Sequence, residues 1–316
     1  MVRMGGNWWR VRQPGCSNCA ATPGGQAHNR NFKAISIVRP MRRGDISAGL
    51  RLCRSSGWNQ LQDDWGYFLD APDSGGMVAE KNGAVAGTVA FLRYGSNFSW
   101  LSMMLVDPGE RRMGIGSKLM EVALEALASE RCVRLDATPL GEPMYRRFGF
   151  VPEYELARAV VSVKAERFRP QPGSVRPMET RDLAQIFVRD REVFGADRSR
   201  LLDSFRRRAP EFAWVAQNGA EVVGYCFGRP GYLYRQLGPI VAESAAIARD
   251  LVMRCLSIEA GNRLVVDAPL AAVEWMEWLQ SSGFEIERRF LRMRRGENYS
   301  PGLPDRQFAI AGPEFG

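Results

Sequence analysis

The residues of this chain with the clearest capacity for chemistry are two glycines and two arginines near position 110. Gly114 and Gly116 lie where an apolar, helix-periodic segment begins, and Arg111 and Arg112 come just before them. A glycine has no Cβ, so a ligand can approach the backbone closely there. The first N–H groups of a helix are unpaired and carry partial positive charge, which favours a phosphate or pyrophosphate. The pattern predicts an anion-binding cradle.

Three elements must position this cradle. Residues 101–106 form an apolar run that predicts a buried strand. Asp107-Pro108-Gly109 is typical of a tight turn, since proline presets φ and glycine adopts positive φ freely. The helix that follows is predicted by apolar residues at helical spacing, namely Ile115, Leu119, Val122, Ala123 and Leu127.

These motifs resemble the acyl-CoA site of the GNAT family of N-acetyltransferases. The family motif Arg/Gln-x-x-Gly-x-Gly/Ala stands here as Arg111-Arg-Met-Gly114-Ile-Gly116. Residues 135–139 then give a strand and residues 144–150 a helix that ends in Gly-Phe. In the family this second pair of elements closes the site, with a tyrosine four residues before the glycine. Tyr145 and Gly149 match that pattern.

The resemblance implies an acetyl-CoA-dependent N-acyltransferase in which the amine attacks directly within a ternary complex. The N–H of Leu105 or of a neighbour would polarise the thioester carbonyl, and Tyr145 would protonate the departing thiolate. An aromatic ring packed between helix and sheet is the alternative role for Tyr145. The residues expected to hold acetyl-CoA are Leu105, Val106, Arg111, Arg112, Met113, Gly114, Ile115, Gly116 and Ser117.

The acceptor side is expected in the segment 58–65. Trp58, Asn59 and Gln60 are predicted to bind the amine substrate, and Asp64 is a candidate general base, acting directly or through water. The alternative is a loop anchored by its tryptophans, with solvated acids. The single histidine, His28, lies outside the predicted domains, so a histidine base is excluded. A dedicated base is not required if the amine binds neutral.

Composition narrows the class of protein. A length of 316 residues suits two domains, and no apolar run reaches the roughly 20 residues that span a bilayer. Six scattered cysteines do not form a disulfide scaffold, and the first 33 residues lack the apolar core of a secretory signal. We therefore expect a cytoplasmic protein with free thiols.

Much of the net charge of +8 lies at the N-terminus. Residues 1–33 contain basic residues and no acidic one, so the predicted domains are nearly neutral. Residues 1–32 lack periodicity and are predicted to be a disordered basic tail. The tail contains Cys16, Cys19 and His28, but a single Cys-x-x-Cys is a weak zinc signal, and no metal site is predicted.

The rest of the chain repeats itself. Val38-Arg-Pro-Met41 leads to Asp45, and Val175-Arg-Pro-Met178 leads to Asp182. Gly87 is echoed by Gly224, Asp136-Ala137 by Asp267-Ala268, and Gly149-Phe150 by Gly283-Phe284, all at a nearly constant offset. This regularity predicts a duplication. The expected fold is α/β (α+β mixed sheet): tandem GNAT-like domains at 34–169 and 174–316, each a mixed, largely antiparallel sheet flanked by helices, with a linker near 166–173.

The second domain is expected to have lost the cofactor. Residues 237–244 stand where the motif should recur, without its glycines and arginine. Residues 231–235 are expected either to cover the acceptor cleft or to seal the contact between domains. Arginines alternate with apolar residues over 288–295, which predicts an edge strand with a solvated basic face; a site for an acidic acceptor is the alternative.

The leading function is therefore acetyl transfer to a small-molecule or peptide amine, by a monomer or homodimer that binds neither nucleic acid nor membrane. A non-catalytic acyl-CoA-binding or sensing protein is the main alternative, and a plugged acceptor cleft would favour it. A nucleic-acid-binding protein driven by the basic tail is a third possibility. The nearly neutral domains argue against that reading.

Overall fold

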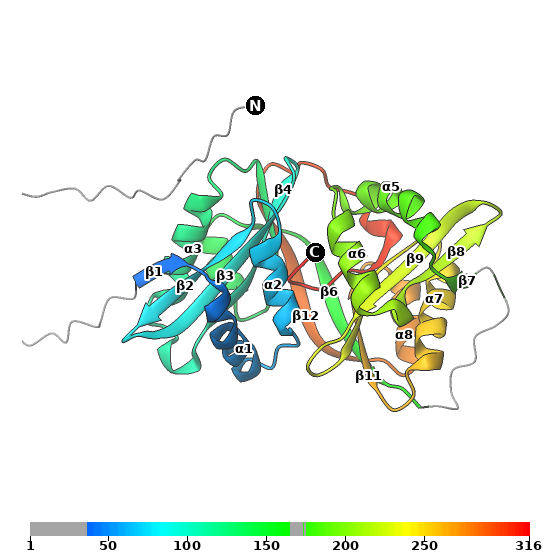
Figure 1. Cartoon of the computed structure of the whole chain (residues 1–316), viewed down its shortest axis with the longest axis horizontal. Coiled ribbons are helices and arrows are strands. Elements are labelled where there is room, and N and C mark those ends of the chain that lie inside the picture. The colour runs from blue at the N-terminus through cyan, green and yellow to red at the C-terminus, as the bar shows by residue number, and fades with distance from the viewer. Residues whose placement is uncertain (1–36, 165–172, 174) are drawn as a thin grey trace, which may run out of the picture. The chain divides into compact units, whose positions relative to one another are not determined.

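One mixed sheet runs through the described part of the chain, which in this computed structural model comprises residues 37–164, 173 and 175–316. The strand order is β1-β2-β3-β4-β5-β12-β6-β11-β10-β9-β8-β7, and β13 pairs with β10 beside this path (Figure 1). No helix in these ranges is long and apolar enough to cross a membrane. The predicted tail, with Cys16, Cys19 and His28, and residues 166–172 of the predicted linker lie outside the described residues.

The first half of the sheet spans residues 37–162. Its hairpin is where the sequence predicts it, because Asn82 and Gly83 supply the positive φ of a tight turn. The apolar stripe of α3 packs on the sheet. The elements are β1 (Ile37–Pro40), α1 (Ile46–Ser55), α2 (Gln62–Asp70), β2 (Gly75–Lys81), β3 (Ala84–Tyr94), β4 (Phe98–Val106), α3 (Ile115–Ala126), β5 (Cys132–Ala137), α4 (Glu142–Arg147) and β6 (Val151–Ser162).

The second half spans residues 175–296 and repeats this order. Arg39 makes a bidentate ion pair with Asp45 (2.8 and 2.9 Å), and Arg176 makes the same pair with Asp182 (2.8 and 2.7 Å). The elements are β7 (Val175–Pro177), α5 (Leu183–Phe194), α6 (Ser199–Arg208), β8 (Trp214–Asn218), β9 (Glu221–Arg229), β10 (Arg235–Ala242), α7 (Ala245–Ile258), β11 (Arg263–Pro269), α8 (Val273–Ser281) and β12 (Glu285–Gly296).

The two halves exchange their last strands. β12, from the second half, lies between β5 and β6 of the first, while β6 lies between β12 and β11. Buried ion pairs accompany the exchange: Arg292 of β12 binds Asp136 of β5 (2.8 and 2.9 Å), and Arg158 of β6 binds Asp267 of β11 (2.8 and 2.8 Å). Each half therefore depends on a strand from the other.

The predicted edge strand at 288–295 is wrong, because β12 has a neighbour on both sides. Arg292 is buried against Asp136 and is not solvated. Alternating arginines indicate an edge strand only if their charges reach water, and a buried carboxylate opposite an arginine replaces that water.

The C-terminal segment, residues 307–316, packs between the halves. It contains the short strand β13 (Gln307–Ala309), and in Figure 1 the chain ends between α2 and α6. Phe315 stacks on Phe68 of α2 (ring centroids 5.5 Å apart) and meets Phe205 of α6 edge-on (5.7 Å). The Trp100 indole N–H donates to the Pro313 carbonyl (2.9 Å). This segment thus forms part of the core shared by both halves.

Candidate active site

The start of α3 is an open, uncapped helix N-terminus. β4 ends at Val106, and Asp107 turns the chain by accepting a hydrogen bond from the Gly109 N–H (3.1 Å). α3 begins at Ile115, directly after Gly114, whose φ of 85° lies in the left-handed region. No side chain caps this helix, so its first N–H groups can bind an anion.

Arginines and small residues surround this helix N-terminus. The side chains of Arg111 and Arg112 are exposed beside it, and Arg111 Nε donates to the Val106 carbonyl (3.3 Å). A Cβ on Gly116 would lie 3.4 Å from Met144 Sδ of α4, so a larger residue would crowd the two helices. The remaining predicted cradle residues are the exposed Met113, the buried Ile115 and the half-buried Ser117.

The strands β4 and β5 separate next to the cradle. They pair only at Ser99–Trp100 and Val133–Arg134, near the beginning of each strand. The register of β4 against β3 shifts in this region, and Met103 takes a φ of 52°. The Thr88 hydroxyl donates to the Met103 carbonyl (2.8 Å) and holds the irregular backbone in place. A slot between the two strands results.

The edge of β4 faces this slot with free backbone groups. The Asp107 N–H donates to the Ala86 carbonyl of β3 (2.8 Å). Successive residues of a strand direct their N–H groups to opposite edges, so the Leu105 N–H also points to β3. The N–H groups of Met104 and Val106 point toward the slot. The sequence predicts Leu105 or a neighbouring residue as the oxyanion donor, and the register favours the neighbours Met104 and Val106.

A cleft opens from this slot toward the C-terminal segment. Its walls come from β4, β5, α4, the loop before α2, both exchanged strands and the C-terminal segment. The lining residues are Trp58, Gln60, Leu101, Ser102, Met103, Met104, Asp136, Thr138, Tyr145, Arg158, Arg288, Phe290, Pro313 and Glu314.

Tyr145 reaches the cleft from α4. Its ring is buried and meets Phe150 at a centroid distance of 6.0 Å, and a Cβ on Gly141 would lie 2.9 Å from Tyr145 Cε2. Burial raises the pKa of this phenol above its ordinary value, so it remains protonated at neutral pH. Its hydroxyl has no hydrogen-bond partner among the described residues and is available to donate.

The predicted acceptor residues divide into two groups. Trp58 and Gln60 line the cleft, and the Arg54 guanidinium binds both of their carbonyls (3.1 and 2.8 Å). Asn59 faces the second half, where its Oδ1 accepts from the N–H groups of Leu233 and Tyr234 (2.8 and 3.0 Å). Residues 231–235 thus contact the first half through Asn59.

Comparison with known proteins identifies the fold in each half. Residues 46–150 match the model described as the acetyltransferase (GNAT) family, and residues 186–309 match an acetyltransferase (GNAT) domain. The chain belongs to the GNAT acetyltransferase family. Two GNAT domains in tandem, as the sequence predicts, are confirmed.

Two curated relatives align with most of the chain. The chain is 26% identical to the holothin acyltransferase of a Pseudoalteromonas species over 82% of this chain and 87% of that one. It is 22% identical to the uncharacterized N-acetyltransferase YitH of Bacillus subtilis over 76% and 84%. A crystal structure from Pyrococcus horikoshii, provisionally assigned as an acetyltransferase, superposes with a TM-score of 0.75 at 21% identity, covering 92% and 99%. The expectation of an acyltransferase is confirmed.

In the second GNAT domain, the chain itself fills the corresponding slot. β10 and β11 also pair only briefly, over Arg235–Leu237 and Leu264–Val266, and then separate. β13 pairs with Ile240 and Val241 of β10, and the Ile310 N–H donates to the Asp267 carbonyl of β11 (2.9 Å). The helix start is closed as well, because Ser244 caps α7.

Asp64 does not line the cleft. It is fully buried, and Arg208 and Arg229 each bind one of its oxygens at 3.0 Å. The Leu61 N–H donates to Oδ2 as well (2.8 Å). The structure therefore brings Asp64 into contact with arginines of the second half, and not with Tyr145.

Several cleft residues were not predicted as site residues. Asp136 belongs to the repeat pattern, which did not indicate the cleft. Arg288 belongs to the alternating arginines, for which an acidic-acceptor site was only the alternative to a solvated edge strand. Arg288 has no carboxylate partner in the described part of the chain. Glu314 carried no signal, because its contacts are formed with residues far away in the sequence.

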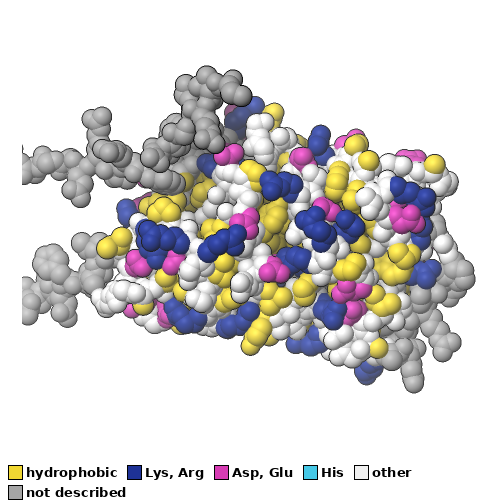
Figure 2. Space-filling model, viewed as in Figure 1, with side chains coloured by type: hydrophobic (Ala, Val, Ile, Leu, Met, Phe, Trp, Pro, Cys, Tyr) yellow, Lys and Arg dark blue, Asp and Glu magenta, His cyan; other side chains and the backbone are white. Residues whose placement is uncertain are grey.

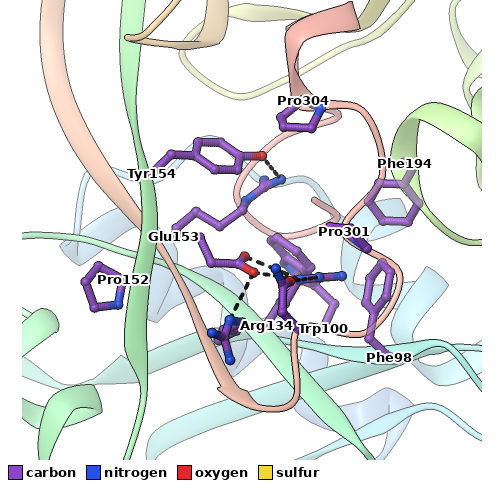
Figure 3. Close-up of a pocket in the computed structure, with 12 residues that line it drawn as sticks. Phe98, Trp100, Arg134, Pro152, Glu153, Tyr154, Phe194, Pro301 and Pro304 are labelled. Carbon is purple, nitrogen blue, oxygen red and sulfur yellow. Dashed lines mark hydrogen bonds and ion pairs between the residues drawn. The ribbon is translucent and has the colours of Figure 1, made fainter.

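A second cavity of about 340 Å³ shares no lining residue with this cleft. Figure 3 shows Arg134 and Glu153 within it, with Tyr154 accepting a hydrogen bond from Arg292 (2.6 Å). Trp100 lines this cavity, and its indole N–H donates a hydrogen bond to the carbonyl of Pro313, which lines the cleft. The C-terminal segment therefore separates the two spaces.

Proposed function

We propose that the first GNAT domain transfers an acetyl group from acetyl-CoA to an amine by direct attack in a ternary complex. The observation that carries the proposal is the continuity of the site: the uncapped start of α3, the slot between β4 and β5, and the cleft containing Tyr145 lie in series. A linear cofactor with a pyrophosphate at one end and a thioester at the other suits such a path.

In this proposal, different groups of the chain contact different parts of acetyl-CoA. The α3 N–H groups, Arg111 and Arg112 bind the pyrophosphate. The N–H groups of Met104 and Val106 donate to the rest of the cofactor and to the thioester carbonyl oxygen. The Tyr145 hydroxyl donates a proton to the departing thiolate sulfur, because it stays protonated at neutral pH.

The acceptor enters from the side of Trp58 and Gln60. The name of the Pseudoalteromonas relative, holothin acyltransferase, makes holothin one candidate acceptor. Arg288, which has no carboxylate partner among the described residues, and the ring of Phe290 suit a planar acceptor with an electronegative group. The space beside Trp58 is the proposed entry for the acceptor, and a non-catalytic acyl-CoA sensor would not require such an entry.

A nucleic-acid partner is a weaker reading. On the face shown in Figure 2, acidic side chains are interspersed among the basic ones of the described residues. Non-specific binding to phosphates requires a continuous basic surface. This charge pattern supports a small acceptor.

Thiol release with an amine panel tests the proposal. The panel contains primary aliphatic amines, aromatic amines, amino acids, short peptides and holothin, and mass spectrometry confirms the acetylated product. We expect release of free thiol with at least one amine, and a calorimetric stoichiometry near one acetyl-CoA per chain. Acetyl-CoA binding without turnover of any amine would instead identify a binding protein.

A further inference from the structure

The C-terminal segment brings a carboxylate into the cleft. Glu314 lines the cleft together with Tyr145 and is 2% exposed. Its Oε1 accepts a hydrogen bond from Arg229 Nη2. Its Oε2 is buried and has no partner among the described residues. A buried carboxylate oxygen without a donor is costly, and in an active site it is ready to accept a proton.

We propose that Glu314 is the general base that removes a proton from the attacking amine. This assignment rests on the proposed acetyl transfer. It concerns a residue of the C-terminal segment, outside both GNAT motifs, and it replaces Asp64 in that role.

The other cleft carboxylate is already occupied. Only Asp136 and Glu314 contribute carboxylates to the cleft lining in the described ranges. Both oxygens of Asp136 are bound by Arg292 (2.8 and 2.9 Å). Asp64 does not line the cleft, and both of its oxygens are bound by arginines. Among these three carboxylates, Glu314 has an oxygen, Oε2, without a hydrogen-bond partner in the described residues.

The surroundings of Glu314 tune its basicity. Burial and the Asp64 carboxylate raise its pKa, while Arg229 and the more distant Arg158 lower it, and the net shift is upward. A carboxylate with a raised pKa is a stronger base than an ordinary glutamate. The hydrogen bond from Arg229 fixes Oε1, and Oε2 therefore keeps a defined position in which it can accept a proton.

The proton balance closes with Tyr145. The amine nitrogen bonds to the carbonyl carbon and loses one proton to Glu314, the carbon–sulfur bond breaks, and Tyr145 protonates the sulfur. After product release, solvent carries the proton from Glu314 to Tyr145. The net reaction is amine plus acetyl-CoA to amide plus CoA, with no proton gained or lost.

Glu314→Gln tests the assignment, because it keeps the shape and the Arg229 contact and removes the base. The acceptor is the amine from the panel that the wild-type protein acetylates fastest. We expect kcat to fall by about 10²-fold, with acetyl-CoA affinity within twofold of wild type. The wild-type kcat/KM should rise with pH through the raised pKa of Glu314, and Glu314→Gln should lack that rise. The matched control is Glu153→Gln in the second cavity, which should keep both kcat and the pH profile.

An unchanged kcat and pH profile in Glu314→Gln would overturn the assignment and leave acetyl transfer intact. Wild-type protein that turns over no amine would overturn the proposed function, and the assignment with it. If Glu314→Gln fails to fold by thermal melting, Glu314→Asp decides: it retains the charge at a shifted position, so kcat should fall while the pH-dependent rise remains. Full kcat in Glu314→Asp would also contradict the assignment.

Discussion

The two GNAT domains of this chain differ most where their central strands separate. In the first, the slot between β4 and β5 is open and leads to an uncapped helix. In the second, β13 fills the slot between β10 and β11, and Ser244 caps the helix. Backbone groups at such a slot need partners, and the second domain satisfies them with its own chain, whereas the slot of the first domain is left open. The comparison shows that a short strand of the same chain can complete this fold at the slot.

The features that both domains share serve stability. Each domain begins with an arginine–aspartate ion pair, formed by Arg39 in the first and Arg176 in the second. Each domain also contributes one arginine to a buried ion pair with an aspartate of the other domain. The predictions below test which features belong to both domains and which to one, from the largest expected effect to the smallest.

Removing the second domain should abolish folding of the first. A fragment of residues 1–169 lacks β12, so β5 loses one neighbour and β6 loses both, since β11 is missing as well. We expect no cooperative unfolding by circular dichroism and no acetyl-CoA binding by calorimetry. Co-expression with residues 170–316 should restore both. A soluble fragment with full acetyl-CoA affinity would show that the strand exchange is dispensable.

Gly114→Val should weaken acetyl-CoA binding by about 100-fold, or about 2.8 kcal/mol. Valine is strained at a φ of 85°, and its side chain would enter the space where the cradle binds phosphate. The matched control is Gly219→Val, in the hairpin turn of the second domain, where φ is 60° and the surroundings are also open. It should cost stability and leave affinity unchanged. Equal loss of affinity in both variants would point to strain alone.

Tyr145→Phe should lower kcat by about 10²-fold and leave acetyl-CoA affinity nearly intact, because the role proposed for the hydroxyl lies mainly in the transition state. Steady-state thiol release and calorimetry provide the two measurements. Tyr154→Phe removes the hydroxyl of a half-buried tyrosine in the second cavity and should keep the wild-type kcat. If Tyr145→Phe also keeps it while chemistry limits turnover, the ring serves packing only.

Asp136→Asn and Asp267→Asn should destabilise the protein by similar amounts, about 2 kcal/mol each, since the amide still accepts a hydrogen bond from the buried arginine but no longer balances its charge. Urea unfolding monitored by tryptophan fluorescence measures the free energy of unfolding. A large loss for only one variant would show that the two exchanged ion pairs are not equivalent.

Much of the fold was predictable because it depends on local patterns. The hairpin at Asn82-Gly83, the apolar stripe of α3 and the repeated motifs are all readable within a few residues. The strand exchange was not predictable, because the arginines and apolar residues of β12 alternate in the same way whether the arginines face water or a buried aspartate. The cradle was predicted from its glycines and stays a prediction; the structure places Gly114 directly before the uncapped start of α3. The position of Asp64 and the role proposed for Glu314 depend on contacts with distant segments, which no local pattern encodes.

The strand exchange also sets an order for synthesis on the ribosome. β5 and β6 are made early, but the strand that joins them begins only at Glu285. At about 5–20 residues per second, the gap after Ser162 lasts on the order of ten seconds. During that time two strand edges of the first domain lack their partner, and exposed edges recruit other chains. The nascent protein is therefore most prone to aggregation while the residues between Ser162 and Glu285 are being synthesised. Its need for chaperones should be greatest during that interval.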